Sequence, residues 1–225
     1  MTSETVPMRW PSAWKDPSLR ALLNGSAITV VESAPPAGVK VVEGVWPGVK
    51  MSRSANQDQA SAGPTGVPWV DSNGWRVRLA RALDPGAIVW VEAKPDERRR
   101  FPDSYLSAIA DIGACGGRWI ISLDDALAEA IAARKPDALD AWNKITAAAG
   151  FFSAHSAWQQ YVPQAVLGVV SDFAAGNKFL SEETLNLVAR TNQQYRVIPK
   201  ARIPAEPFAG GLPVKSWPAA RITRT

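Results

Sequence analysis

The sequence has little material for metal binding or nucleophilic catalysis, because it contains a single cysteine, Cys115, and a single histidine, His155. One cysteine excludes an internal disulfide. A structural zinc site or a Ser-His-Asp triad needs ligands and bases that this composition scarcely supplies. We therefore expect no metal and no other cofactor. Cys115 is expected to be a small buried thiol, and His155 to cap or pack near a helix end.

Long hydrophobic runs and a signal peptide are also missing. No segment approaches the roughly 20 apolar residues that span a bilayer. Residues 1–10 lack the apolar core of an export signal. The sequence therefore predicts a cytoplasmic protein without a membrane partner, and export stays open if the true start codon lies elsewhere.

Two groups of arginines stand out in a chain whose net charge is only +4. Neither group is interleaved with aromatic residues, so the sequence argues against a nucleic-acid partner. The second group, Arg98 to Arg100, follows a proline in a predicted loop. The first group, Arg76 to Arg81, lies on an otherwise apolar predicted helix, where charged residues are typical of the solvated face. The groups are Arg76, Arg78 and Arg81, and Arg98, Arg99 and Arg100.

Apolar residues are plentiful, at 46% of the chain against 20% charged residues, which is the balance of a globular protein with a core. The ten tryptophans are unusual. Most buried tryptophans fill cores. An exposed indole ring, however, also offers a flat surface on which a sugar ring stacks.

Short β-branched runs without charges alternate with helix-like stretches. Such runs are typical of buried parallel strands, and the alternation predicts an α/β fold. We expect an incomplete (β/α)-barrel-like parallel sheet with helices over residues 10–162. A partial Rossmann-like βαβ unit over 163–202 and a proline-rich irregular tail over 203–225 follow it. The predicted strands are 27–31, 39–42, 88–91, 119–122, 166–170 and 195–198, and the predicted helices are 14–23, 74–83, 104–112, 125–133, 138–152 and 182–190.

Two places do not fit a complete fold. Only residues 32–38 separate the first two predicted strands, whereas a parallel crossover needs about a dozen residues or more. These strands are therefore either an antiparallel pair or neighbours of a missing segment. After residue 198 the chain is rich in proline and has no periodicity, so the βαβ unit has no predicted third strand of its own.

Carboxylates follow nearly every predicted strand. The carboxyl ends of parallel strands meet at one edge of a sheet, where active sites are built. A glycosidase needs one carboxylic acid to protonate the leaving oxygen and one carboxylate to attack or to activate water. We take Glu92 and Asp124 as candidates for these roles. The alternatives are a helix N-cap for Asp124 and a solvated loop residue for Glu92. The strand-end carboxylates are Glu32, Glu43, Glu92, Asp124, Asp125 and Asp172.

A loop over residues 61–75 is rich in proline, glycine and tryptophan. It presents Trp69, Asp71, Asn73 and Trp75 just before a predicted helix, and Trp46 lies in a similar turn upstream. Flat aromatic rings beside polar side chains suit a sugar, whose ring stacks while its hydroxyls form hydrogen bonds. In the alternative interpretation an Asp or Asn caps the helix and the tryptophans cover the core.

Four segments together resemble a bacterial family of glycoside-hydrolase-like proteins, in which a (β/α) barrel precedes a glutamine-amidotransferase-like domain of the β-galactosidase trimerisation type. The resemblance covers residues 10–202 and implies no assigned catalytic residues. Relatives of this kind have further strands where this chain has only 32–38, and they continue beyond Thr225. The chain looks like a shortened member. The matching segments are 44–51, 60–75, 118–125 and 167–173.

The resemblance implies a carbohydrate-active protein whose partner is an oligosaccharide or glycoside and whose catalysis is impaired or lost in the shortened form. The alternative is a non-catalytic binding or assembly module derived from such an enzyme. In that case open strand edges favour association into a homo-oligomer.

Overall fold

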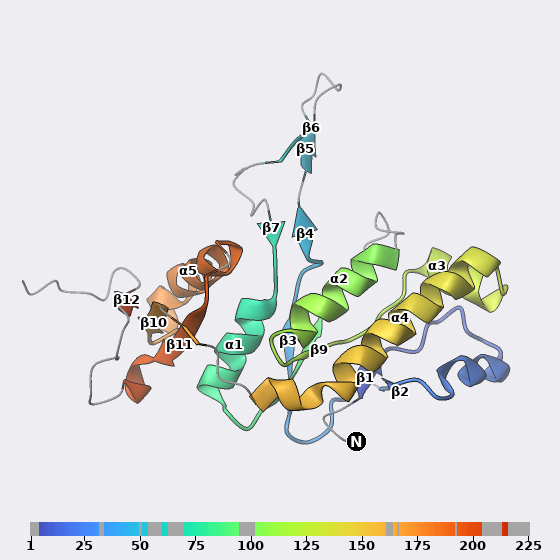
Figure 1. Ribbon diagram of the computed structural model, residues 1–225, viewed down its shortest axis with the longest axis horizontal. Coiled ribbons are helices and arrows are strands. Elements are labelled where there is room, and N and C mark those ends of the chain that lie inside the picture. The colour runs from blue at the N-terminus through green and yellow to red at the C-terminus, as the bar shows by residue number, and fades with distance from the viewer. Residues whose placement is uncertain are drawn as a thin grey trace, which may run out of the picture.

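The structure is a computed structural model that describes residues 5–31, 34–49, 51–53, 60–62, 70–94, 102–160, 164–165, 167–191, 193–203 and 213–215. Small parallel sheets with helices packed against them make up most of this part (Figure 1). The α/β class predicted from the sequence is therefore confirmed. Over the described ranges, no helix is long and apolar enough to cross a lipid bilayer.

The main sheet has five parallel strands in the order β2-β1-β9-β8-β3. One parallel bridge, between Met8 and Ile121, joins β1 to the chain just after β9. Hydrogen bonds of 2.9 Å from the Arg9 N–H to the Ile121 oxygen, and from the Ile121 N–H to the Pro7 oxygen, complete this seam. The strands are β1 Val6–Met8, β2 Ile28–Val30, β3 Val39–Glu43, β8 Ile88–Glu92 and β9 Arg118–Trp119.

This strand order is the one found around the seam of a (β/α)8 barrel, where the first strand pairs with the last. Within the described residues, no further strand pairs with the outer edges of β2 and β3. The described part is thus an incomplete, (β/α)-barrel-like parallel sheet.

The link between β2 and β3 is not a hairpin. The two strands lie at opposite edges of the sheet and run parallel to their neighbours, so the antiparallel pair considered above is wrong. Val31, where the link begins, is 7% exposed and packs with Trp90 and Ile120. Val31 therefore packs on the inner face of the sheet, which we define as the face that carries Ile88, Trp90 and Ile120.

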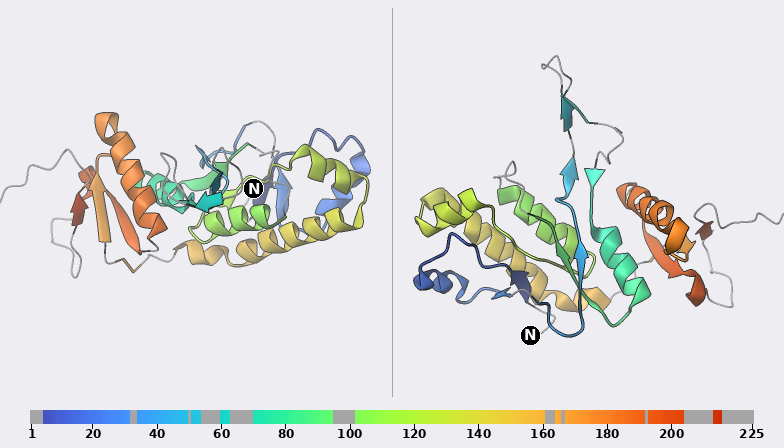
Figure 2. Two further views of the ribbon diagram at one scale, coloured as in Figure 1. Left: turned by 90° about the horizontal axis from the view of Figure 1, so that it is seen from above. Right: turned by 180° about the vertical axis from the view of Figure 1, so that it is seen from behind.

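Helices cover the opposite, outer face. There the apolar side chains of Val89, Val91 and Trp119 pack with Ile112 and Ile145 from two of the helices. Figure 2 shows α2 and α4 running side by side along the sheet. The helical elements of this part are η1 Pro17–Leu23, α1 Gly74–Leu83, α2 Pro102–Gly113, α3 Asp125–Ala132, α4 Pro136–Ala154 and η2 Ser156–Gln160.

An antiparallel arm lies between β3 and α1. β4 (Gly48–Val49) pairs with β7 (Val70–Asp71), and β5 (Met51–Arg53) pairs with β6 (Ala60–Ala62). Figure 1 shows the arm standing out beyond the carboxyl end of β3. The tryptophan-rich loop belongs to this arm, and Trp69 lies outside the described residues.

A second unit, which we define as residues 167–203 with β12, lies beside α1 (Figures 1 and 2). Its parallel strands have the order β11-β10-β12. The expectation that the tail adds no third strand is wrong, because Pro213–Lys215 pairs with β10. A strand this short carries no periodic pattern to recognise. The elements are β10 Leu167–Ser171, η3 Ala175–Asn177, α5 Lys178–Arg190, β11 Tyr195–Pro199, η4 Lys200–Arg202 and β12 Pro213–Lys215.

Helix α1 belongs to both cores. Val77 and Ala80 pack in the core of the main sheet, whereas Trp75 and Leu79 pack in the core of the second unit with Leu185. The two units therefore share one helix, which joins them through apolar contacts on two of its faces.

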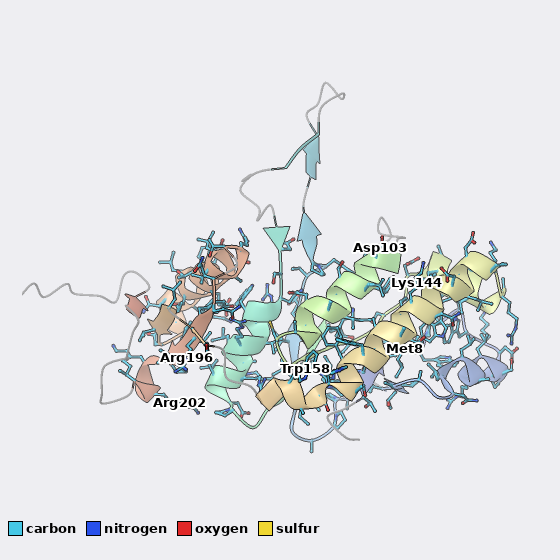
Figure 3. The ribbon with its side chains drawn as sticks, in the orientation of Figure 1. Met8, Asp103, Lys144, Trp158, Arg196 and Arg202 are labelled. Carbon is cyan, nitrogen blue, oxygen red and sulfur yellow. The ribbon has the colours of Figure 1, made fainter. Side chains whose placement is uncertain are left out.

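The arginines of α1 are half-buried, so the predicted solvated face describes only part of their environment. The Arg78 guanidinium lies 4.6 Å from the centroid of the Tyr195 ring, and Arg76 lies 4.4 Å from that of Trp75. Arg202 of the second unit donates a 2.9 Å hydrogen bond to the carbonyl oxygen of Ala82 at the end of α1 (Figure 3). A polarity pattern misses such contacts because long arginine stems cover aromatic rings while their charged heads stay near water.

Candidate functional site

Two glutamates end neighbouring strands at the carboxyl edge of the main sheet, which we call the rim. Glu43 of β3 and Glu92 of β8 are partners in the parallel register. Side chains alternate along a strand, so Glu92 shares the inner face with Ile88 and Trp90. The backbones of registered residues on adjacent strands lie about 4.8 Å apart, which makes the two glutamates neighbours in the sheet.

Arg9 fixes the carboxylate of Glu92. Its Nε lies 2.8 Å from Oε1 and its Nη2 lies 3.2 Å from Oε2, which is a bidentate pair. The hydrogen bond with Glu92 raises the pKa of Arg9. The two side chains are 29% and 34% exposed, so the pair adds little stability but remains open to a ligand.

Glu43 is exposed at the rim. Among the residues described by the structure, no cation lies within ion-pair distance of its carboxylate. The two rim glutamates therefore differ, because Glu92 has a fixed counter-charge and Glu43 has none at contact distance.

Asp124 lies on the helix side and has a structural role. Its Oδ1 accepts a 2.9 Å hydrogen bond from the Leu127 N–H, so the N-cap interpretation is confirmed. Tyr105 donates from its hydroxyl to Asp124 Oδ2 at 3.1 Å and accepts from the Asp124 N–H at 2.8 Å. Asp124 is 4% exposed. Among the described residues its hydrogen bonds run to Tyr105 and Leu127 and not to Glu92, and a joint acid–base role for the two stays a prediction.

Asn73, at the start of α1, forms hydrogen bonds with the segment after β3 and with α2. Its Oδ1 accepts from the Val45 N–H at 2.8 Å, and its Nδ2 donates to the Val45 oxygen at 2.7 Å. Asp111 of α2 accepts from the Asn73 N–H at 2.6 Å. Asn73 is the N-cap residue of α1, but its side chain makes no capping bond, so the predicted capping role of this side chain is wrong.

Gly44 makes this arrangement possible. A Cβ at this position would lie 2.3 Å from Val91 Cγ1 and 3.0 Å from Asn73 Oδ1. Only glycine therefore lets the chain leave β3 so close to β8 and to the Asn73 side chain.

The predicted sugar-contacting residues that the structure describes are largely buried. Trp46 is 8% exposed, donates from Nε1 to the Lys94 oxygen at 2.7 Å, and meets Tyr105 edge-on at 5.0 Å. Trp75 is 4% exposed, Asp71 is 6% exposed and Asn73 is 0% exposed. Their packing interpretation is favoured, and contact with a sugar stays a prediction.

One further strand-end carboxylate lies elsewhere. Asp172 follows β10 in the second sheet, where it accepts from the Ala174 N–H at 3.3 Å and from Asn177 Nδ2 at 3.2 Å. It therefore does not share the rim of the main sheet. Glu32, like the arginines at 98–100, lies outside the described residues.

Arg9 is a site residue that the sequence did not reveal. It follows β1, a three-residue strand with a proline at its centre, which no periodicity test recognises. The only available signal was a charged residue directly after an apolar run near the N-terminus.

The packing of two tyrosines predicts how stability depends on pH. Tyr105 and Tyr195 are 1% and 2% exposed, and burial raises the pKa of each phenol well above its usual value near 10. Both phenols are neutral below about pH 10, so their stabilising effect is fully present there. At higher pH only the unfolded chain ionises readily, and stability falls by about 1.4 kcal/mol per pH unit for each group.

Urea unfolding between pH 9 and 11 measures this fall. We expect Tyr105→Phe and Tyr195→Phe each to make the decline above pH 10 less steep. If neither variant changes its steepness, the two phenols are not the groups responsible.

Comparisons of the chain with protein-family models, with curated proteins and with solved structures found no match.

Proposed function

We propose that the chain is a carbohydrate-binding protein of the glycoside-hydrolase-like type, with its binding site at the rim around Arg9, Glu43 and Glu92. The observation that carries this proposal is the registered pair of glutamates at the carboxyl edge of a parallel sheet, one of them held by an arginine. Convergent carboxylates and a guanidinium are suited to binding the hydroxyl groups of a sugar.

The spacing of the glutamates also suits glycosidic bond cleavage. Retaining glycosidases place their two carboxyl groups about 5–5.5 Å apart, and the backbones of registered residues on adjacent strands lie about 4.8 Å apart, so the two glutamate side chains start from a compatible spacing. In this proposal Glu92 attacks the anomeric carbon while Glu43 gives its proton to the leaving oxygen. Glu43 then takes a proton from the water that releases the sugar from Glu92.

Efficient hydrolysis is not expected from this chain. A catalytic acid usually lies in a desolvated pocket that keeps it protonated, whereas Glu43 is exposed. The incomplete barrel explains this exposure, because the edge beyond β3 has no neighbouring strand in the described residues. Binding with weak or absent turnover is therefore the function that the geometry supports best.

Isothermal titration with a panel of oligosaccharides of glucose, galactose, mannose and xylose tests the proposal. We expect Glu92→Gln to weaken binding about tenfold or more, because it removes one charge-assisted partner of the sugar hydroxyls and frees Arg9. Glu129→Gln, an exposed substitution on α3, is the matched control and should leave binding unchanged. Wild-type protein that binds no member of the panel would refute the proposal.

A second candidate is an assembly module. The observation that favours it is the exposed outer strand β3, whose burial pattern is mostly solvent-facing and whose outer edge has no partner in the described part of the chain. Open strand edges invite pairing with another chain. A concentration-dependent dimer in light scattering, together with no glycan binding, would favour this function over the first.

A further inference from the structure

Arg76 lies in the first turn of α1, where the main sheet meets the second unit. Its guanidinium carbon stacks 4.4 Å from the centroid of the Trp75 ring. The ring belongs to the core of the second unit, so the stacking holds the arginine head at the boundary between the units. A planar group stacked in this way is already ordered before a ligand arrives.

The hydrogen-bond donors of Arg76 are unused. Its Nε is buried without a partner, and none of its side-chain nitrogens has a hydrogen-bond acceptor among the described residues. Within that part of the chain, no carboxylate lies within ion-pair distance of the guanidinium either. Because only Nε is fully covered, the terminal nitrogens are the donors that a ligand reaches.

Three carboxylates surround Arg76 at longer range. Burial lowers the pKa of the guanidinium, and the charges of Glu182, Glu43 and Asp71 oppose that shift. Glu182 comes from α5 of the second unit, whereas Glu43 is one of the two rim glutamates. The charges of one rim glutamate and of the second unit therefore both act on Arg76.

This combination selects the chemistry of the ligand. An anion placed against Arg76 would be repelled by the three carboxylates, and a cation by the guanidinium. A neutral polyhydroxyl compound satisfies both, because its oxygens accept from the arginine while its hydroxyl protons reach the carboxylates.

We propose that Arg76 and Glu182 form a second sugar subsite next to the Glu43–Glu92 subsite, so that the binding site spans both units and prefers oligosaccharides to monosaccharides. This proposal rests on the proposed function. Glu43 lies between the two subsites and contacts the linkage region of the bound chain.

Titration with glucose and galactose, each as monosaccharide, disaccharide and trisaccharide, tests the second subsite. We expect Arg76→Gln to weaken trisaccharide binding about tenfold and to leave monosaccharide binding unchanged, because only the longer ligand reaches both subsites. Arg76→Lys should also lose most of the preference for the trisaccharide over the monosaccharide, since a lysine lacks the planar pair of terminal donors. Arg196→Gln, an exposed change on β11, is the control and should have no effect (Figure 3).

The possible failures of the two proposals are distinct. If Glu92→Gln weakens every ligand but Arg76→Gln leaves trisaccharide binding intact, the second subsite is refuted and the proposed function stands. If the wild type binds none of the six sugars and no member of the larger panel, both fail. Should Arg76→Gln not fold, Glu182→Gln on α5 provides the same test, because it must also weaken the trisaccharide selectively.

Discussion

Replacing Asn73 by alanine is expected to lower the free energy of unfolding by about 3 kcal/mol. The side chain is 0% exposed and makes 2.8 Å and 2.7 Å hydrogen bonds with the N–H and oxygen of Val45, and a 3.2 Å bond with Asp111 Oδ2. Its removal leaves two backbone groups buried without partners, and each such group costs about 1–3 kcal/mol. Urea unfolding followed by circular dichroism measures the loss.

Asn143→Ala is the matched control for this experiment. Asn143 is exposed on α4, so its replacement should change the free energy of unfolding by no more than about 0.5 kcal/mol. Equal effects of the two substitutions would show that Asn73 does not hold residue 45 to α1 and α2.

Replacing Trp75 by alanine is expected to lower the free energy of unfolding by about 3–5 kcal/mol and to loosen the second unit selectively. The ring is 4% exposed and packs with Val169, Leu185 and Tyr195. Removing a buried indole leaves a cavity and exposes apolar surface. Because this cluster joins α1 to the second unit, limited proteolysis should cut within residues 167–203 before it cuts the main sheet.

Trp158→Ala provides the control. Trp158 is 50% exposed in η2, and its loss should cost less than about 1 kcal/mol (Figure 3). If Trp75→Ala instead retains full stability and loses oligosaccharide binding, the indole contacts the ligand as the sequence analysis predicted, and the packing interpretation fails.

The local elements of the fold could be predicted from the sequence. The helix expected at 74–83 coincides with α1, and the strands expected at 39–42 and 88–91 match β3 and β8 to within one residue at each end. These segments have clear periodicity or an uninterrupted apolar run, bounded by glycine or proline. α4 begins two residues before the expected helix, because Pro136 occupies its first turn.

The order of the strands could not be predicted. β1 and β12 have three residues each, which is too short for a pattern, and both form through pairing with a distant strand. The bridge between Met8 and Ile121 joins β1 and β2 to the other strands of the main sheet. Nothing in the local sequence around either residue predicts that the two pair. Long-range pairing of this kind is decided by the whole chain.

The site was only partly predictable for a related reason. The position of Glu92 at the rim follows from the rule that parallel strands end together. Its partner Arg9 does not, because the pairing depends on β1 lying next to β9. Asp124 shows the opposite case. A carboxylate between a strand and a helix can be either a catalytic group or a helix N-cap, and in the structure Asp124 is the N-cap of α3.

The pairing of β1 with the chain after β9 also constrains how the protein folds during synthesis. Met8 leaves the ribosome long before Ile121, and at about 5–20 residues per second the interval is roughly 6–23 s. Throughout that time Val6 and Met8, which are 1% and 0% exposed in the finished fold, have no outer-face core to enter. The nascent N-terminal segment is therefore a natural substrate for a chaperone that shields apolar residues until the last strand of the main sheet emerges.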